Sequence, residues 1–464
     1  MLDSVIGLRG YAERAGNLIG GGGPGGRIVA TRSGRCDGDA GVSENHAARR
    51  GPRGPHAGTF RLRTTKIFQV TLAAATLWLA GCTTTPAPRV SLVAVPTEQR
   101  GRAEKNVRVF ERVWSLVADW HYDPKLRDVD WPAAGARYGA EAAAATDEKA
   151  LYESLNAMVG LLKDSHTHAL PPAQVLERHT HTRARTGFYM TREGGRWIVN
   201  EVIAGSPAEV AGVKTGWIVV ARNGTPFGER SEARPKEGEV ARWEFVDDQD
   251  RPVALDIAAK SLSTKPRQEV RALAGGFVYL RFDAFDTADR RWLSEQLKAN
   301  RAAPGVVIDL RRNPGGGTIS LGITIGEFFE KSVDCGTFIT RGGYRGGKSS
   351  WQIGSARYAG RVAVLVDGAT GSAAEIFSAV LQEHGRATIV GRKTAGAVLA
   401  SWFHSLPDGG ELQLSREDYV TPKGRRLELD GVEPDVKVTR SLADLRVGRD
   451  ADLEAALRVL AEQR

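Results

Sequence analysis

The chain of 464 residues is 41% hydrophobic and 26% charged, which is ordinary for a globular protein with two or three domains. Its formal net charge is +9, but the 11 Lys and Arg against 5 Asp and Glu of residues 1–81 account for +6 of it. The remaining +3 on residues 82–464 predicts no nucleic-acid-binding surface. The three cysteines have no paired spacing and no accompanying His cluster, so neither a disulfide framework nor a metal site is predicted.

Two segments precede the expected mature chain. Residues 1–60 contain GGGPGG and scattered arginines with almost no periodic apolar pattern, which predicts a disordered or untranslated extension. Residues 61–81 combine a basic start, an apolar stretch too short for a typical transmembrane helix, and Leu-Ala-Gly directly before Cys82. This arrangement closely resembles the lipobox of bacterial lipoproteins; the alternative is a buried N-terminal helix. The resemblance implies lipidation of Cys82 and, because Thr83 follows it, a place at the outer membrane facing the periplasm.

Residues 82–104 are predicted to form a tether, and residues 105–180 a mainly helical region, because apolar residues recur at helical spacing from Val107 onward. The last of these helices is expected to end near residue 162, before a run of polar residues that contains His166. On its own, His166 has three open interpretations: a solvated loop residue, a catalytic residue or a metal ligand.

Short strands follow, and residues 183–262 resemble a PDZ domain of the bacterial protease kind. The resemblance implies that Thr186, Gly187 and Phe188 form the loop whose backbone amides bind a peptide C-terminus. Residues 228–239 depart from the pattern, because they are polar where a peptide-groove helix carries apolar side chains. A purely structural β module is the alternative.

A strand, a turn and a helix are predicted around Ser372. Residues 362–366 are an unbroken apolar run, and apolar residues recur at helical spacing beyond Ser372. The hydroxyl of Ser372 would then lie at a helix start, where unpaired amides and the helix dipole favour developing negative charge. An acyl-transfer nucleophile needs such a place. The alternative is a capping box formed by Ser372 and Glu375.

A second predicted strand, residues 305–310, runs into three consecutive glycines at positions 315–317. Consecutive glycines let the backbone approach a ligand and direct amides at it, either around a phosphate or as an oxyanion hole. This glycine loop contains neither nucleotide-binding pattern, glycine followed by Lys and Ser or Thr, or GxGxxG. A plain loop is the alternative.

Five motifs in order closely resemble the tail-specific, carboxy-terminal-processing serine peptidase family: DSHT, DLRRNPGGG, TGSAAEI, GRATIVGRKTAG and GVEPDVKV. The resemblance covers residues 105–440 and implies an α/β fold. A crotonase-like peptidase core at residues 263–445 would carry an inserted PDZ-like domain and be followed by a C-terminal helix at residues 446–464. The resemblance also implies that Ser372 is the nucleophile and that the amides of Gly316 and Ala373 form the oxyanion hole.

The general base departs from one branch of that family. In the Ser/Lys branch the base is a lysine 25 residues after the serine, but this position holds Ala397. The tricorn-like branch uses a histidine from a Ser-His pair, which Ser165 and His166 match. That branch also uses a carboxylate just before the GVxPD motif, which Glu428 matches best, with Asp430 as the competitor.

We therefore expect a serine endopeptidase of the cell envelope that cleaves unfolded or C-terminally recognised polypeptides and needs no cofactor. The expected partners are polypeptide substrates and the membrane that holds the lipid anchor. Lys393 lies before the family's Thr-x-Gly and is interpreted as structural or solvated. A catalytically inactive protein that binds peptides or apolar ligands is the alternative, because the family's lysine is missing. Acyl-CoA chemistry is a third hypothesis, but it would not need Ser372.

Overall fold

The computed structural model describes residues 85, 87–228, 234–353 and 357–462. Residues 80–464 form one compact unit. The predicted extension, the predicted signal peptide and Cys82 lie outside the described residues. Across the described ranges, no helix is both long and apolar enough to cross a membrane.

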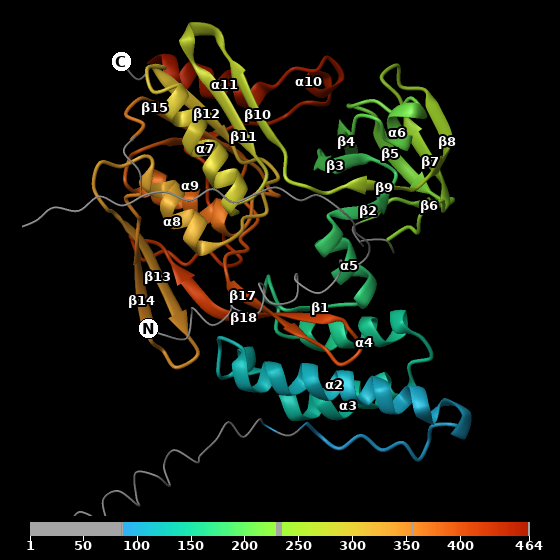
Figure 1. Cartoon of the computed structure of the whole chain (residues 1–464). Coiled ribbons are helices and arrows are strands. Elements are labelled where there is room, and N and C mark those ends of the chain that lie inside the picture. Colours follow the sequence, from blue (N-terminus) through green and yellow to red (C-terminus); the bar gives the residue numbers. More distant parts are fainter. Residues whose placement is uncertain (1–84, 86, 229–233, 354–356, 463–464) are drawn as a thin grey trace, which may run out of the picture. The chain divides into compact units, whose positions relative to one another are not determined.

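Three helices form a layer at the start of the described chain (Figure 1). They are α2 (Arg100–Trp120), α3 (Trp131–Ala144) and α4 (Glu148–Gly160), with short 3-10 turns η2 (Thr97–Gln99) and η3 (Leu126–Asp128) beside them. Asp130 and Asp147 cap α3 and α4, because each carboxylate accepts a hydrogen bond from the amide three residues on. Phe110 of α2 and Met158 of α4 are fully buried in the core between the helices.

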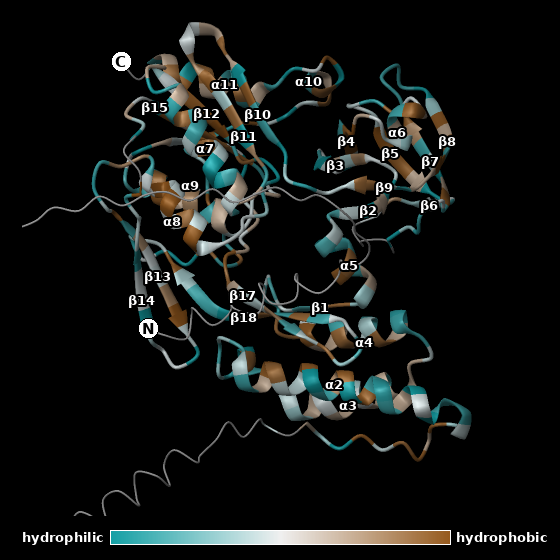
Figure 2. Ribbon diagram, viewed as in Figure 1, coloured by the Kyte–Doolittle hydropathy of each residue, from teal (hydrophilic) through white to brown (hydrophobic). Residues whose placement is uncertain are grey.

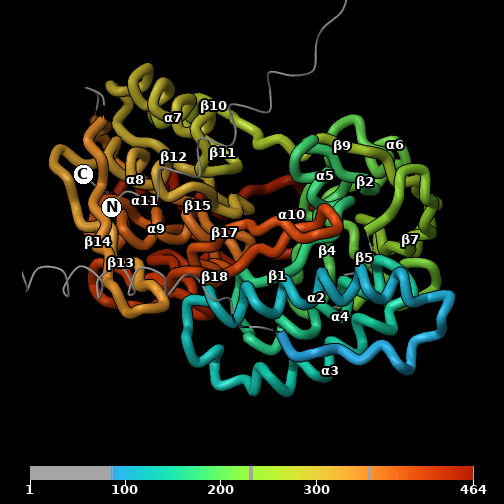
Figure 3. Tube along the Cα trace, turned by 60° about the horizontal axis from the view of Figure 1, so that its bottom comes forward, coloured from blue at the N-terminus to red at the C-terminus, as the bar shows by residue number. Residues whose placement is uncertain are grey.

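A five-stranded sheet packs against this helical layer. Its order is β1-β18-β13-β14, and β17 pairs with the other edge of β18. The strands are β1 (His168–Leu170), β13 (Asp334–Thr340), β14 (Arg345–Ser349), β17 (Ala400–Ser405) and β18 (Glu411–Val420). Leu412 and Leu414 of β18 pack on the helices, and the tube in Figure 3 follows β1, β17 and β18 beside them. Because β1 and β17 both pair with β18, the segments that directly precede these two strands lie near each other.

An antiparallel β domain follows in the chain. Its sheet has the order β3-β4-β5-β7-β8, with β6 on β5. The elements are β2 (Thr182–Arg185), β3 (Phe188–Glu193), β4 (Arg196–Val202), α6 (Pro207–Val210), β5 (Ile218–Arg222), β6 (Thr225–Pro226), β7 (Val240–Val246), β8 (Pro252–Ala258) and β9 (Lys260–Ser263), preceded by α5 (Pro172–Thr180). β2 pairs with β9, and Phe188, Trp243 and Phe245 lie in the domain's own core.

The central sheet has the order β10-β11-β12-β15-β16-β19, and every pair is parallel except β10 with β11. Its elements are β10 (Gln268–Ala272), η4 (Ala274–Gly276), β11 (Val278–Phe282), α7 (Thr287–Ala299), β12 (Gly305–Asp309), α8 (Thr318–Gly326), β15 (Arg361–Val366), α9 (Ala373–Glu383), β16 (Thr388–Gly391), β19 (Val436–Lys437), α10 (Leu442–Arg446) and α11 (Ala451–Glu462). Ile308 and Val364 pack against α7, α8 and α9, whereas Val307 and Leu365 pack against α11. Figure 2 shows how apolar α8 and α9 are.

The mixed α/β architecture predicted from the sequence is confirmed, and the predicted strands 305–310 and 362–366 correspond to β12 and β15 within a residue. The predicted tether differs more. Helix α2 begins at Arg100, inside the range 82–104, and Ala87 and Val90 pack against the helical layer. Apolar contacts therefore extend into a segment whose composition alone favours an extended chain.

Candidate active site

Ser372 lies in the turn between β15 and α9. Its φ of 52° and ψ of −120° lie outside the regions that non-glycine residues prefer. The amide of Ser372 donates to the carbonyl of Ala397 at 2.7 Å and to Oε2 of Glu375 at 3.1 Å, and both bonds hold this strained backbone in place. The turn puts Ser372 at the N-terminus of α9, where the helix dipole stabilises negative charge.

The glycine loop touches this turn. Gly315 has a φ of 97°, and a Cβ atom there would lie 2.6 Å from both the Cβ of Ser372 and the nitrogen of Ala373. Only glycine permits so close an approach. The amides of Gly315 and Gly317 both donate hydrogen bonds, but within the described ranges the amides of Gly316 and Ala373 donate none. The two amides predicted to form an oxyanion hole are thus available to a ligand.

Ser165, His166 and Glu428 form a line of hydrogen bonds. The hydroxyl of Ser165 lies 2.6 Å from Nδ1 of His166 and donates to Oε2 of Glu428 at 2.9 Å. The amide of Ser165 donates to Oε1 of the same carboxylate at 2.9 Å. Glu428 is buried and accepts a third bond, from the amide of Val398 at 3.1 Å. The carboxylate therefore has a fixed orientation toward Ser165.

Residues 397 and 398 connect this line to the turn that carries Ser372. The carbonyl of Ala397 accepts from the amide of Ser372, and the amide of the next residue, Val398, donates to Glu428. Ser372 and the carboxylate of Glu428 are thus bonded to adjacent residues of one segment. The fold brings together residues from three distant parts of the chain.

Glu375 has a larger structural role than its predicted part in a capping box. Besides the amide of Ser372, its buried carboxylate accepts from the amides of Gly396 at 2.7 Å and Ala397 at 2.8 Å, and from the hydroxyl of Thr394. These bonds fix the segment that runs between Ser372 and Glu428. The sequence predicted only the local contact, because nothing near Glu375 in the chain signals a bond to residues 394–397.

The competitors of the predicted base and carboxylate lie at the surface. Nζ of Lys393 is 3.1 Å from Oδ1 of Asp430 and 3.4 Å from Glu433, and the side chains of Lys393 and Asp430 are 47% and 75% exposed. This is a solvated ion pair. Glu428, and not Asp430, bonds to Ser165.

Burial controls the protonation of His166 and Glu428. It lowers the pKa of His166, against the opposing charge of Asp164, so the neutral imidazole that can accept a proton is favoured. Burial also raises the pKa of Glu428, although the donors Val398 and Ser165 act in the opposite direction.

The β domain offers a separate pair of amides at the start of β3. Gly187 has a φ of 102°, and its carbonyl accepts from the amide of Ile203 at 2.8 Å and from the hydroxyl of Ser206 at 3.1 Å. In the part of the chain that the structure describes, the amides of Thr186 and Gly187 donate no hydrogen bond. Phe188 is buried and begins β3, which is an edge strand and can pair with an extended peptide.

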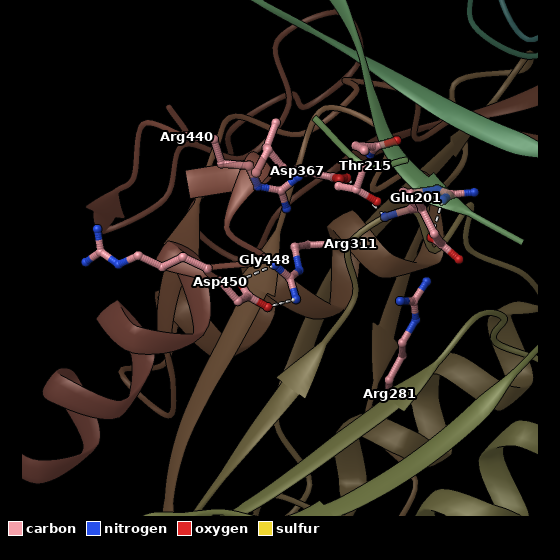
Figure 4. Close-up of a pocket in the computed structure, with 12 residues that line it drawn as sticks. Glu201, Thr215, Arg281, Arg311, Asp367, Arg440, Gly448 and Asp450 are labelled. Atoms are coloured by element: carbon pink, nitrogen blue, oxygen red, sulfur yellow. Dashed lines mark hydrogen bonds and ion pairs between the residues drawn. The ribbon is translucent and has the colours of Figure 1, made fainter. Parts of the chain in front are cut away.

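A cavity of about 260 Å³ lies between the β domain and the central sheet (Figure 4). It is lined by Asn200, Glu201, Thr215, Arg281, Arg311, Arg312, Asp367, Arg440, Leu445, Gly448, Arg449 and Asp450. Arg312 joins the two sides, because its amide donates to Asp367 at 3.0 Å and its side chain donates to Glu201 at 2.6 Å. None of the predicted catalytic residues is among those that line this cavity.

Comparison with solved structures shows the same fold in two proteases. The photosystem II D1 C-terminal processing protease has a TM-score of 0.53 at 22% identity, and the match covers 77% of this chain and 98% of that one. Mature CPAF complexed with lactacystin has a TM-score of 0.57 at 12% identity, with the same coverage of 77% and 98%.

Comparison of sequences finds similarity to peptidases over most of the described chain. Residues 276–438 match the model of peptidase family S41, and residues 103–160 match the tricorn protease C1 domain. The chain is 27% identical over 385 residues to the carboxyl-terminal-processing protease of Picosynechococcus, covering 76% of this chain and 88% of that protein. It is 26% identical over 336 residues to the carboxy-terminal-processing protease of Bartonella bacilliformis, covering 67% and 75%. Residues 276–438 are therefore similar to peptidase family S41, and the chain is a serine peptidase that resembles carboxyl-terminal-processing proteases.

Proposed function

We propose that this peptidase is an endopeptidase of the bacterial cell envelope in which Ser372 is the nucleophile and His166 the general base. The observation that supports this most is the path of hydrogen bonds from Ser372 through residues 397–398 to Glu428 and Ser165. Because Nδ1 of His166 faces Ser165, Nε2 is the nitrogen left to accept a proton.

The proposed reaction begins when Oγ of Ser372 attacks the carbonyl carbon of the scissile peptide and its proton moves to Nε2 of His166. The carbonyl oxygen becomes an oxyanion that accepts hydrogen bonds from the amides of Gly316 and Ala373. The carbon–nitrogen bond then breaks, and His166 returns the proton to the leaving amine. Water then gives a proton to His166 and attacks the acyl carbon. His166 passes that proton to Oγ of Ser372 as the ester bond breaks, which releases the acid product and regenerates the enzyme.

We interpret the central sheet as a crotonase-like core and the β domain as a PDZ-like insertion. The available amides of Thr186 and Gly187 beside the edge strand β3 support this interpretation. A substrate's terminal carboxylate would accept hydrogen bonds from these amides while its chain extends β3. The substrates would be unfolded polypeptides with an accessible C-terminus.

A lipid on Cys82 would place the enzyme at the outer membrane, as the lipobox-like sequence suggests. Cys82→Ser with the signal retained should leave the precursor uncleaved and unlabelled by radioactive palmitate. Labelling of the variant at the wild-type level would end the lipoprotein assignment.

The proposed catalysis is tested by reaction with a fluorophosphonate probe and by digestion of a denatured polypeptide. The wild-type protein should do both, and Ser372→Ala should do neither. Ser378→Ala is the matched control, since Ser378 lies on α9 and its hydroxyl donates within that helix, to the carbonyl of Ala374 at 2.7 Å. A wild-type protein that binds peptides but neither reacts nor cleaves would instead be an inactive binding protein.

A further inference from the structure

A buried imidazole–carboxylate pair lies under the loop that carries His166. His121 follows α2 directly, and its Nε2 is 2.8 Å from Oδ2 of Asp164. Both side chains are 0% exposed. We propose that His121 is a positioning residue, which acts through Asp164 to hold His166 in the orientation that proton transfer requires. This inference rests on the proposed role of His166 as the base.

The loop from residue 164 to residue 167 folds around the carboxylate of Asp164. Oδ1 accepts from the amides of His166 at 3.0 Å and Thr167 at 2.7 Å. Oδ2 accepts from the hydroxyl of Thr167 at 2.7 Å and lies against His121. The backbone of His166 is therefore fixed by a carboxylate whose own place depends on His121.

The carboxylate of Asp164 is buried and charged, so it needs the hydrogen-bond donors that surround it. Burial by itself would raise the pKa of Asp164, but the hydrogen bonds from His121 and Thr167 lower it to about 2. The carboxylate is thus ionised wherever the enzyme works. A buried carboxylate left without its donor would draw in water or turn toward another partner.

His121 is itself held in place from two directions. Its Nδ1 lies 3.2 Å from the backbone of Asp123, and its carbonyl accepts from the guanidinium of Arg341 at 2.9 Å. The next residue, Tyr122, donates its amide to the carbonyl of Ser415 on β18 at 3.0 Å. The imidazole is therefore a rigid support, connecting the end of a helix to the loop of the base.

Two variants of His121 test the proposal, because both carry a side-chain amide but the two side chains differ in length. Gln at position 121 can place a donor where Nε2 of histidine lies, whereas Asn is too short. We expect His121→Asn to lower kcat by about 10- to 100-fold with little change in KM, because small misplacement of a catalytic group costs that much. His121→Gln should restore most of kcat. Equal kcat for wild type and His121→Asn would overturn the proposal.

A double-mutant cycle shows whether His121 acts through Asp164. Asp164→Asn keeps an acceptor for the amides of His166 and Thr167, so it is expected to fold. Adding His121→Asn to it should lower kcat far less than in the wild-type background, and additive losses would overturn the proposal. Tyr152→Phe is the matched control, because Tyr152 lies in the same helical layer and the change removes its bond to Asp408 in the turn between β17 and β18. Near-ultraviolet circular dichroism checks the fold of each variant.

Measurements on the wild-type enzyme and on Ser372→Ala distinguish a failure of this inference from a failure of the proposed function. Loss of probe labelling in Ser372→Ala, together with a fully active His121→Asn enzyme, would leave the proposed function standing and remove His121 from it. Absence of cleavage by the wild type would instead remove the proposed function.

Discussion

The hydroxyl of Ser165 separates the imidazole of His166 from the carboxylate of Glu428. The carboxylate of Glu428 would therefore act on a protonated His166 only through the neutral hydroxyl between them. Its stabilising effect should be smaller than that of a carboxylate in direct contact with the ring. The hydroxyl of Ser165 also sets the orientation of the His166 ring, since it is hydrogen-bonded to Nδ1.

Glu428→Gln should consequently lower kcat by at least about tenfold, but by less than the roughly 10⁴-fold loss known for a carboxylate that orients a catalytic histidine directly. Asp430→Asn is the control, because Asp430 is exposed and its carboxylate pairs with Lys393 at the surface. Steady-state kinetics on a peptide substrate measures both. Equal losses in the two variants would mean that the carboxylate is assigned wrongly.

The family resemblance predicted Ser372, Ser165, His166 and Glu428 as one set. The structure bonds Ser165 to both His166 and Glu428, while the catalytic roles of the four residues stay a prediction. The sequence was insufficient for His121 and for the wider role of Glu375. Their bonds join segments far apart in the chain, and a single histidine or glutamate carries no local pattern that predicts a buried partner.

At the scale of elements, the contact between the glycine loop and the start of α9 is the feature that positions the free amides of Gly316 and Ala373. Gly315 lies against Ser372 with no room for a Cβ atom, and its backbone is in a conformation that favours glycine. The neighbouring Gly317 differs, because its φ is −77° and a Cβ there would meet nothing closer than 3.7 Å.

Gly315→Ala should therefore push the loop away from Ser372 and lower kcat by about 10²- to 10³-fold, the cost of losing one oxyanion donor. Gly317→Ala should keep most of the activity. Both are measured as kcat on one peptide substrate after folding has been checked. A fully active Gly315→Ala enzyme would show that the loop does not bind the oxyanion.

Elements with a clear apolar period were predictable, and β12, β15 and α9 lie within a residue or two of their predicted positions. The packing of residues 87 and 90 was not, since the core that they contact includes residues from distant segments, among them Leu412 and Leu414. Local composition indicates a tether there, and tertiary contacts override it.

At the scale of the whole molecule, the β domain and the glycine loop are physically connected. Glu201 of β4 bonds to Arg312, three positions before Gly315 of the glycine loop, and to Arg267 in front of β10. A peptide bound at β3 would therefore lie on a domain anchored beside the catalytic loops.

If the amides of Thr186 and Gly187 bind a terminal carboxylate, amidating the C-terminus of a substrate should raise KM. The loss corresponds to one or two charge-assisted hydrogen bonds of about 1.5 to 3 kcal/mol each. Paired peptides that differ only in this group provide the measurement. Equal KM values would make the β domain a structural module.

The role of His166 as the general base for Ser372 is tested most directly by the pH dependence of fluorophosphonate labelling. Neutral His166 must take the proton of Ser372, and burial lowers its pKa, so the labelling rate should hold steady down to about pH 6.5 and fall only below it. Lys393→Ala should show the same profile, and His166→Ala should hardly react at any pH. A labelling rate that already falls below about pH 8, or an unimpaired His166→Ala variant, would contradict the account.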